Sequence, residues 1–457
     1  MKRDPKVTRL RTLFCALSCL VLMSGAVAAK VAVTPSPQQI SVYEASSEKD
    51  RVGLLIALAK TGHAELAAEM LRRYPLTGKF AANRTLFIEG LILHSRGNLT
   101  GAVQKYRDAL ANDPSLTLVR SELAKTLFEL GENDGAKHHL SLLMADAPSS
   151  VQAQGIRSFI DTIDASRPYN FSAFISAAPS TNINNGSSLT KVYENNGGEI
   201  TIDPNSRKKS GIGLLAGANA GFSKRLGNDF SVVLGGNAIG HLYNDKAYNA
   251  YGTSESAELR YLFPDGDVGL GVVSSQSIKS DASGLSYYSY GPRVSLQKDL
   301  TPKDRLNLST VYEWRNFPDN SLNDATALMM DGSWSHGFSS SLTVSLDGGY
   351  DRVKSEIDYD SYNSYSAGLG IYKELPYGVT AYAHGTVRKA DFDGIFPIYN
   401  RVRKDTRYTG TVSLTKRDFS IWGYAPELEY TYSFNDSNIA SYYFDSHAVN
   451  FTLSKDF

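Results

Sequence analysis

The carboxyl-terminal part of the chain alternates sharply between apolar and polar residues with a period of two. Between Glu427 and Phe434, one face of an extended segment carries Leu, Tyr, Tyr and Phe, and the other carries Glu, Glu, Thr and Ser. The last segment, His447 to Phe457, repeats this pattern. Because successive side chains of a strand point to opposite faces, each segment is predicted to be a strand that separates an apolar medium from a polar one.

A soluble sandwich and a membrane barrel can both produce this alternation. In a sandwich the apolar faces pack on each other, whereas in a barrel they contact lipid and the polar faces line a lumen. The chain has 27 tyrosines, several of them clustered near strand ends, as in the interfacial girdles of barrels. After the first segment of the chain, no stretch supplies about eighteen consecutive apolar residues, so any spanning must be done by strands.

The alternation predicts a fourteen-stranded antiparallel transmembrane barrel over residues 168–457. An even strand number suits a single-chain bacterial barrel whose two ends lie on the same side. Closure requires Tyr169 to Ala178 to pair antiparallel with Ala440 to Phe457, since an open edge in lipid leaves backbone groups unsatisfied. The predicted strands are 169–178, 209–225, 229–243, 250–263, 268–279, 285–299, 305–316, 323–336, 339–353, 361–374, 379–390, 402–415, 419–434 and 440–457.

The connections between these strands differ in length. Short turns at 264–267, 301–304 and 376–378 alternate with longer segments such as 317–322 and 391–401. In bacterial barrels the short turns face the periplasm and the long loops face the outside. A domain that precedes the first strand is therefore predicted to lie in the periplasm.

The same alternation assigns side chains to the two faces of the wall. Charged side chains are costly in hydrocarbon and cheap in water, so they are predicted to face the lumen. The predicted lumen-facing charges are Glu258, Arg260, Asp347, Glu427 and Glu429. The predicted lipid-facing residues are Leu259, Val268, Leu270, Val294, Leu296, Leu306, Leu308, Leu342, Val344, Leu346, Val412 and Leu414.

Residues 50–167 show a repeat in place of the strand pattern. Gly97, Ala102 and Pro114 recur as Gly131, Ala136 and Pro148, each 34 residues later. Small residues at these positions allow two antiparallel helices to touch, and the spacing is that of tetratricopeptide units. The sequence predicts a short solenoid, with 54–74 as an earlier unit and 151–163 as a capping helix. Such a solenoid offers a concave surface to a peptide or protein, and buttressing of the barrel is the alternative.

The first 49 residues are predicted to lie outside both domains. Residues 1–29 combine a basic start, an apolar core and the cleavage sequence Ala26-Val27-Ala28, which is typical of a secretory signal peptide. Both cysteines, Cys15 and Cys19, fall inside it, so the mature chain is expected to have none. Residues 30–49 are polar, contain Pro35 and Pro37, and are predicted to be a linker.

Neither charge nor motifs indicate an enzyme or a nucleic-acid partner. The formal net charge is zero, and no zinc-protease, hydrolase-elbow or phosphate-loop motif occurs. Adjacent His138 and His139 cannot share one helix face, and Asp445-Ser446-His447 cannot form a triad along one strand. We therefore expect no catalytic residue, metal or cofactor. The basic run 401–407 is predicted to be a solvated outer rim beside anionic glycolipid, with cargo contact as the alternative.

This organisation resembles that of the surface lipoprotein assembly modulators, the outer-membrane translocators of the type XI secretion system. The resemblance rests on Phe174 to Asn185 at the barrel entry, Trp422 to Tyr432, Asn435 to Asn438, and the ending Lys455-Asp456-Phe457. It implies transport of specific lipoproteins, or of related soluble haem- or metal-acquisition proteins, from periplasm to cell surface. In some relatives that transport serves nutrient acquisition or host colonisation.

The resemblance also implies partners and candidate positions. The expected partners are the cargo, a periplasmic chaperone, outer-membrane lipids and the barrel insertion machinery. The alternatives are a polysaccharide exporter, a class that also couples tetratricopeptide repeats to a barrel, and a general porin, for which the solenoid would be superfluous. The candidate cargo or gate residues are Asn182, Asn184, Glu258, Arg260, Pro426, Glu427, Glu429 and Phe457.

Overall fold

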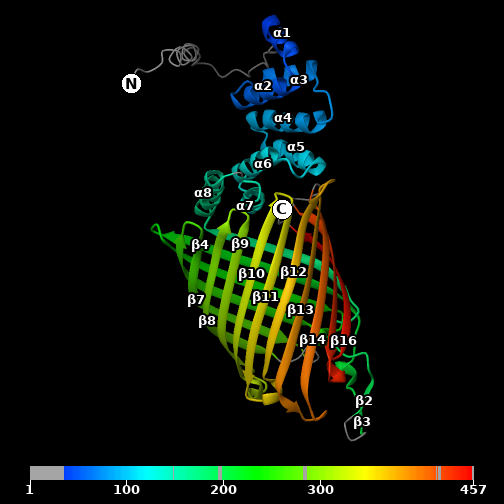
Figure 1. Cartoon of the computed structure of the whole chain (residues 1–457). Helices are drawn as coiled ribbons and strands as arrows, with labels where there is room; N and C mark the ends of the chain where they lie inside the picture. The colour runs from blue at the N-terminus through cyan, green and yellow to red at the C-terminus, as the bar shows by residue number, and fades with distance from the viewer. Residues whose placement is uncertain are drawn as a thin grey trace.

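The computed structural model describes residues 35–147, 149–193, 198–280, 286–417, 419 and 424–454. The expected signal peptide, Pro148, Trp422 and the ending Lys455 to Phe457 lie outside these ranges. Helices occupy the first part of the described chain and strands the remainder (Figure 1). Within the described ranges, no helix is both long enough and apolar enough to cross a bilayer.

The helical unit is a stack of helix pairs. The described helices are α1 (Pro37–Ala45), α2 (Glu48–Lys60), α3 (Ala64–Arg73), α4 (Ala81–Ser95), α5 (Leu99–Asn112), α6 (Thr117–Glu129), α7 (Asn133–Met144) and α8 (Ser150–Ser166). Pairs α4–α5 and α6–α7 are the two predicted repeat units, α2–α3 is the earlier one, and α8 is the cap. One buried cluster runs from Tyr43 on α1 to Ile163 on α8, so the stack has a continuous core.

The repeat glycines have the roles that the 34-residue period predicts. Gly97 and Gly131 adopt φ of 76° and 78° in the turns between paired helices, a conformation that favours glycine. A β-carbon on Gly90 would lie 2.4 Å from a ring carbon of Tyr106. Helices α4 and α5 can therefore approach only because residue 90 has no side chain, and Ala124 occupies the equivalent position in the second unit.

Fourteen of the strands close into an antiparallel barrel in the order β1-β16-β15 and so on down to β4. The barrel strands are β1 (Tyr169–Ser180), β4 (Gly211–Leu226), β5 (Phe230–Tyr243), β6 (Ala250–Phe263), β7 (Gly266–Lys279), β8 (Tyr287–Thr301), β9 (Asp304–Asn316), β10 (Ala325–Ser339), β11 (Leu342–Ser355), β12 (Tyr362–Leu375), β13 (Val379–Phe396), β14 (Arg401–Lys416), β15 (Ala425–Ser437) and β16 (Phe444–Ser454). The predicted strand number, order and closure of first strand on last are confirmed.

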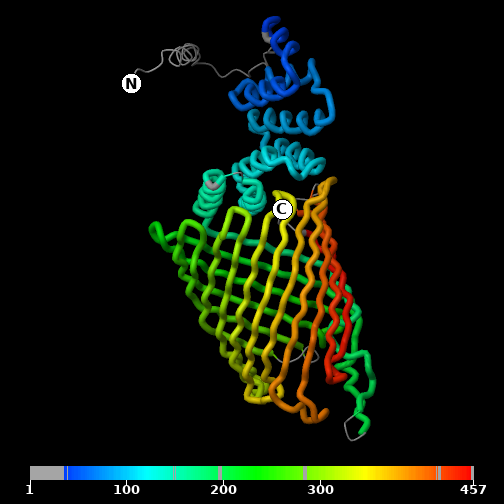
Figure 2. The backbone as a smooth tube through the Cα atoms, viewed as in Figure 1, coloured from blue at the N-terminus to red at the C-terminus, as the bar shows by residue number. Residues whose placement is uncertain are grey.

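The wall separates the two faces as predicted. Outward side chains such as Leu259, Leu270 and Val412 are about half exposed, which suits contact with lipid. Glu258 and Arg260, one residue on either side of Leu259, face the interior and pair with each other. The helices stand over the end of the barrel that carries the short turns, and longer connections lie at the other end (Figure 2). We call these the short-turn end and the long-loop end.

Three expectations about connections were wrong. Residues 30–49 are not all linker, because α1 forms after Ser36 and its Tyr43 is fully buried in the helical core. The loop after the first strand contains a hairpin, β2 (Lys191–Tyr193) with β3 (Glu199–Thr201), which was missed because each strand has only three residues. The segment 391–401 is mostly strand, because β13 continues to Phe396.

Candidate functional site

The last helices lie directly on the short-turn rim of the barrel. On α8, Arg157 pairs with Asp265 at 2.7 Å and with Asp299 at 3.2 Å, and Asp161 pairs with Arg225 at 3.1 Å. Every barrel residue in these pairs lies in or near one of the short turns that join β4 to β5, β6 to β7 and β8 to β9. The helical unit is thus placed over one mouth of the barrel by side chains from several strands.

A second contact between helices and rim is deeply buried. Arg120 on α6 and Glu374 at the end of β12 pair at 2.5 Å, and both side chains are fully buried. Arg417, just after β14, approaches the same carboxylate at 2.7 Å. The Arg120 guanidinium also donates to the carbonyl of Pro114 at 2.7 Å. We call Arg120, Glu374 and Arg417 the rim ion cluster.

The adjacent histidines of α7 complete this interface. His139 is buried, and its Nδ1 lies 3.2 Å from a terminal nitrogen of Arg120. His138 lies 3.4 Å from the hydroxyl of Tyr372 on β12. Burial lowers the pKa of His138 to about 4 and the pKa of His139 well below its usual value, with the nearby arginines acting in the same direction. Both rings are therefore neutral near pH 7, which avoids burying a further cation beside Arg120.

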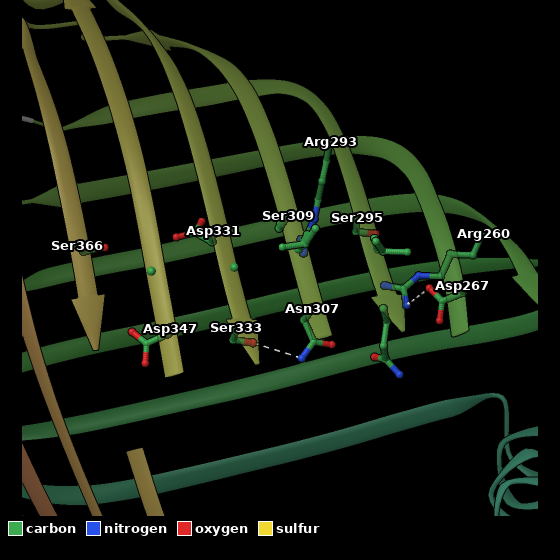
Figure 3. A pocket seen from close by; sticks show the side chains of 15 residues that line it. Arg260, Asp267, Arg293, Ser295, Asn307, Ser309, Asp331, Ser333, Asp347 and Ser366 are labelled. Carbon is green, nitrogen blue, oxygen red and sulfur yellow. Dashed lines mark hydrogen bonds and ion pairs between the residues drawn. The ribbon is translucent and has the colours of Figure 1, made fainter. Parts of the chain in front are cut away.

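The lumen is lined by polar and charged side chains, and a cavity of about 310 Å³ lies against the wall from β6 to β12. Figure 3 shows side chains from these neighbouring strands projecting to the same side. Glu258 is buried, forms ion pairs with Arg260 at 3.0 Å and with Arg293 at 3.2 Å, and accepts a hydrogen bond from Ser295 at 3.0 Å. Arg260 also reaches Asp267 at 3.2 Å. Glu258 and Arg260 thus face the lumen, as their alternation predicted, and they belong to one luminal ion network.

Other predicted luminal charges contact polar side chains of nearby strands. Asp347 lies 2.8 Å from His384, and Glu429 accepts from Asn450 at 2.9 Å. Glu427 and Pro426 stand at the start of β15, in register with Thr452 and Leu453 of β16. Pro426 is tolerated there because proline is accommodated near a strand start. These residues lie beside the junction of β16 with β1, and Phe457 lies outside the described residues.

Asn182 and Asn184 lie at the long-loop end. The side-chain amide of Asn182 donates to the carbonyls of Gly186 and Asp445, both at 2.9 Å, and its oxygen accepts from the Gly186 amide. The amide of Asn184 donates to the carbonyls of Asn205 and Arg207. The two asparagines therefore fold the loop after β1 and attach it to β16. A direct role in gating by these side chains stays a prediction.

The eight candidate residues do not form one site. Those that the structure describes fall into three groups: the long-loop end, the luminal wall at β6, and β15 beside the closing strands. The rim ion cluster was missed by sequence reasoning. Arg120 and Glu374 are 254 positions apart, and the only signal at Arg120 was an arginine on the otherwise apolar side of a repeat helix.

The basic run 401–407 was wrongly predicted to be an outward rim throughout. Arg403 turns inward, pairs with Asp405 at 2.5 Å, and lies over the ring of Tyr442 at 3.3 Å. The guanidinium of Arg407 lies over the ring of Phe444. Alternation along β14 explains this, because every second residue of the run must face the lumen. Among the described residues, no group of three or more potential metal ligands gathers anywhere.

Comparison with known proteins covers both parts of the chain. Residues 169–457 match the family described as surface lipoprotein assembly modifier, and residues 93–158 match the tetratricopeptide repeat family. Surface lipoprotein assembly modifier 1 of Haemophilus influenzae is 24% identical over 447 residues, which cover 93% of this chain and 88% of that protein. Hemophilin secretion modulator of Acinetobacter baumannii is 24% identical over 403 residues, covering 82% and 79%.

Two solved outer-membrane proteins align with about two thirds of the chain. A Pseudomonas aeruginosa homologue of FadL aligns with a TM-score of 0.36 at 11% identity, covering 63% of this chain and 90% of that one. The outer-membrane channel DcaP of Acinetobacter baumannii aligns with a TM-score of 0.36 at 11% identity, covering 63% and 96%.

Proposed function

The chain belongs to the surface lipoprotein assembly modifier family, and from that premise we propose that it transfers specific proteins from the periplasm to the cell surface. It is an outer-membrane barrel with a helical unit outside the barrel. The family supports a role in surface lipoprotein assembly. The proposal goes further: the helical unit, on the periplasmic side, receives the cargo and presents it to the barrel mouth.

The observation that carries this proposal is the buried contact between α6 and β12. A tether would hold the helices near the barrel without fixing their direction, whereas Arg120 and Glu374 are both fully buried across the interface. Ion pairs from α8 fix a second point of the rim. Two fixed points set the orientation of the solenoid over the opening, which is what delivery of a bound protein into one mouth requires.

The lumen supports the same proposal. Several of its charges are paired with one another, as in Glu258 with Arg260 and Arg293. A lining of neutralised pairs exerts little net attraction on either sign of charge, which suits passage of a polypeptide with mixed side chains. The cargo in this proposal is either a lipoprotein or a related soluble protein. The proteins to which this chain is similar include both a surface lipoprotein assembly modifier and a hemophilin secretion modulator.

The test compares the proteins accessible at the surface of intact cells. Cells with the gene, without it, and complemented are labelled with an impermeant reagent, and the labelled proteins are quantified. We expect one or a few lipoproteins or secreted proteins to disappear from the surface in the null strain, to remain at normal total abundance, and to return on complementation. Unchanged surface proteins together with loss of surface polysaccharide would contradict the proposal and favour the exporter.

A further inference from the structure

The outer face of β6 carries a carboxylate within the part of the wall that faces lipid. The outward residues of this strand run from Tyr251 near the long-loop end to Tyr261 near the short-turn end, and both tyrosines are about half exposed. Interfacial aromatic residues border the lipid-facing band of a barrel. Glu255 lies between these tyrosines on the same face and is exposed, on the half nearer the long loops. Its register partner on β7, Ser274, adds a hydroxyl.

A carboxylate on the lipid face of a barrel is unfavourable, and more so toward the middle of the bilayer. Arg352, an outward charge near the long loops, pairs with Asp393 at 2.6 Å. Glu255 forms no ion pair with any other residue in the part of the chain that the structure describes. Ionisable groups that face hydrocarbon generally mark a functional contact. Glu255 is therefore positioned to contact a molecule in the membrane.

An apolar groove adjoins Glu255 and Ser274 on the outside of the wall, from β6 to β9. Its volume is about 410 Å³. The apolar side chains that line it are Ala257, Val272, Pro292, Tyr290 and Trp314. The rings of Tyr290 and Trp314 lie 5.5 Å apart, and Val272 is 59% exposed. The groove thus combines an apolar surface with one carboxylate and one hydroxyl.

Pro292 makes the wall irregular where the groove lies. Register partners between β8 and β9 are missing at Gly291 and Pro292 and resume at Arg293. Proline has no N–H to donate to a neighbouring strand. A β-carbon on Gly291 would collide with the carbonyl oxygen of Tyr312, so β8 and β9 approach closely at this point. The outer surface is therefore shaped locally by the Gly291-Pro292 pair.

The lumen behind this part of the wall is unsuited to a hydrocarbon chain. On the inner side of the same strands, Arg260 and Arg293 project into the lumen and pair with Glu258 (Figure 3). An acyl chain passing there would gain no apolar surroundings and would separate charges from their partners or from water. An acyl chain therefore stays on the lipid side of the wall, where the groove lies.

We propose that this outer groove binds an acyl chain of a lipoprotein cargo, and that Glu255 and Ser274 hold the acylated end of its polypeptide. The inference rests on the proposed function and specifies which part of the cargo is recognised. A lipoprotein carries its acyl chains on an N-terminal cysteine, whose amide N–H groups donate to a carboxylate. Because the groove lies nearer the long-loop end, it receives the anchor on the side where the polypeptide leaves the barrel.

Charge distinguishes this occupant from the lipids that surround the barrel. Phospholipids and surface glycolipids carry phosphate groups, which the Glu255 carboxylate repels. The acylated amino terminus of a lipoprotein offers amide donors and has no phosphate. The apolar side chains alone would accept any acyl chain, so Glu255 supplies the selectivity of the groove.

The first experiment uses the full-length chain in nanodiscs of phosphatidylethanolamine and phosphatidylglycerol. The probe is a synthetic triacylated cysteine joined to a short neutral peptide. A photo-crosslinking amino acid replaces Val272 in the groove or, as control, Val412 on β14, which is also outward and 51% exposed. We expect the probe to crosslink several-fold more at position 272 than at 412, and phospholipid to crosslink equally at both.

Three results would overturn the inference. Equal crosslinking of the probe at both positions would mean that the lipopeptide is only dissolved in the bilayer. Enrichment of phospholipid at position 272 as strong as that of the probe would mean that the groove holds ordinary lipid. Crosslinks from position 272 only to a second copy of the chain would make the groove a contact between copies.

Glu255→Leu tests the polar end of the groove. The substitution removes a charge from the lipid face, so the barrel should fold at least as well as the parent, as heat-modifiable gel mobility reports. Because a hydrogen bond to a charged group is lost, we expect crosslinking of the probe at position 272 to fall roughly tenfold. Thr253→Leu, on the same outward face but outside the groove, should leave it unchanged. Unchanged crosslinking in folded Glu255→Leu would contradict the role of the carboxylate.

The second experiment measures delivery in cells, with an epitope-tagged copy of the protein that the surface comparison identifies as cargo. Ala257→Trp fills the groove, and Leu346→Trp on β11 is the control on a lipid-facing position that is 48% exposed. We expect a several-fold loss of surface delivery for Ala257→Trp alone, and normal delivery by that variant, once folded, would overturn the inference. A cargo without an acyl chain would also overturn it and leave the proposed function standing. A null strain that loses no surface protein would refute the proposed function itself.

Discussion

At the scale of single residues, the contact between Arg120 and Glu374 decides how the two parts of the molecule are joined. Both side chains are fully buried, and Arg417 shares the same carboxylate. Taking charges out of water is costly, so such a cluster adds little to stability when intact. Removing Glu374 would leave two arginines without their carboxylate, and removing Arg120 would abolish the ion pair that crosses from α6 to the rim. The main effect of the cluster is therefore to fix one docked orientation, and its contribution to the free energy of docking is small.

Arg120→Met should release α6 from the rim. Glu374 would keep its pair with Arg417 but lose the pair that crosses to α6, so a broad range of solenoid orientations should replace one orientation. Spin labels at Leu118 on α6 and Leu300 on β8, which are 52% and 51% exposed, report the distance between helices and barrel. We expect a narrow distribution in the parent protein and a broad one in the variant.

The matched control is Arg96→Met. Arg96 pairs with Glu65 at 2.8 Å, but both side chains are exposed, so the pair contributes at most about 1 kcal/mol. Its distance distribution should equal that of the parent. An equally narrow distribution in Arg120→Met would mean that the rim ion cluster does not fix the orientation.

Docking should weaken on acidification between about pH 6.5 and pH 4. Above the ordinary histidine pKa of 6.5, His138 is neutral whether the helices are docked or released, so pH has no effect through this ring. Below it, a released His138 takes up a proton, whereas the docked ring, with its pKa lowered to about 4, does not. The released state is therefore favoured progressively until about pH 4, where the effect levels off.

The same spin-label distances, recorded as pH is lowered, measure this dependence. Glu374, Arg120, Arg107 and Arg417 face the histidines, and protonation of Glu374 at low pH would also weaken docking. A variant with His138→Gln and His139→Gln separates the two causes, since it should lose the change between pH 6.5 and 5 and keep any change that begins near pH 4. An unchanged pH profile in that variant would exclude the histidines as the cause.

At the scale of elements, the repeat and the strands were predictable for different reasons. The 34-residue recurrence of Gly97 and Gly131 made the helix pairs predictable, because the positive φ of those turns favours glycine. The strands were predictable because lipid and water impose opposite chemistry on their two faces. The short hairpin β2–β3 was not predictable, since strands of three residues are too short to show a period of two. It is held by Val192 and Ile202 packing on Tyr399 and Ile439 from distant loops.

Gly90→Ala should destabilise the first repeat unit. The new β-carbon would lie 2.4 Å from the ring of Tyr106, which is fully buried and cannot move away freely. Overpacking of this kind costs about 1–3 kcal/mol, so the thermal unfolding of the helical signal should shift to lower temperature. Circular dichroism at a helix-sensitive wavelength measures the shift.

Gly155→Ala on α8 is the control for that substitution. No atom lies within 4 Å of a β-carbon at this position, and replacing a helical glycine by alanine stabilises by about 0.5–1 kcal/mol. The two variants should therefore shift the unfolding temperature in opposite directions. A neutral or stabilising effect of Gly90→Ala would mean that α4 and α5 are not packed through this contact.

At the scale of the whole molecule, the helical stack is placed at one end of the barrel. The stack stands on the short-turn end of the barrel (Figure 1), and β1 follows its last helix, α8, directly along the chain. Sequence alternation could predict the wall and its closure. It could not predict the docked orientation, because that depends on contacts between residues more than two hundred positions apart, such as Arg120 with Glu374.

The most direct measurement compares the full chain with a form in which residues 1–34 are joined to 168–457, expressed in cells that otherwise lack the gene. The readout is the fraction of the tagged cargo that added protease digests on intact cells, with heat-modifiable mobility as the measure of barrel folding. We predict that the barrel alone folds and that the surface fraction of the cargo falls to the level of the null strain. Full surface delivery by the folded barrel alone would contradict the account, since the docked helices would then have no part in transport.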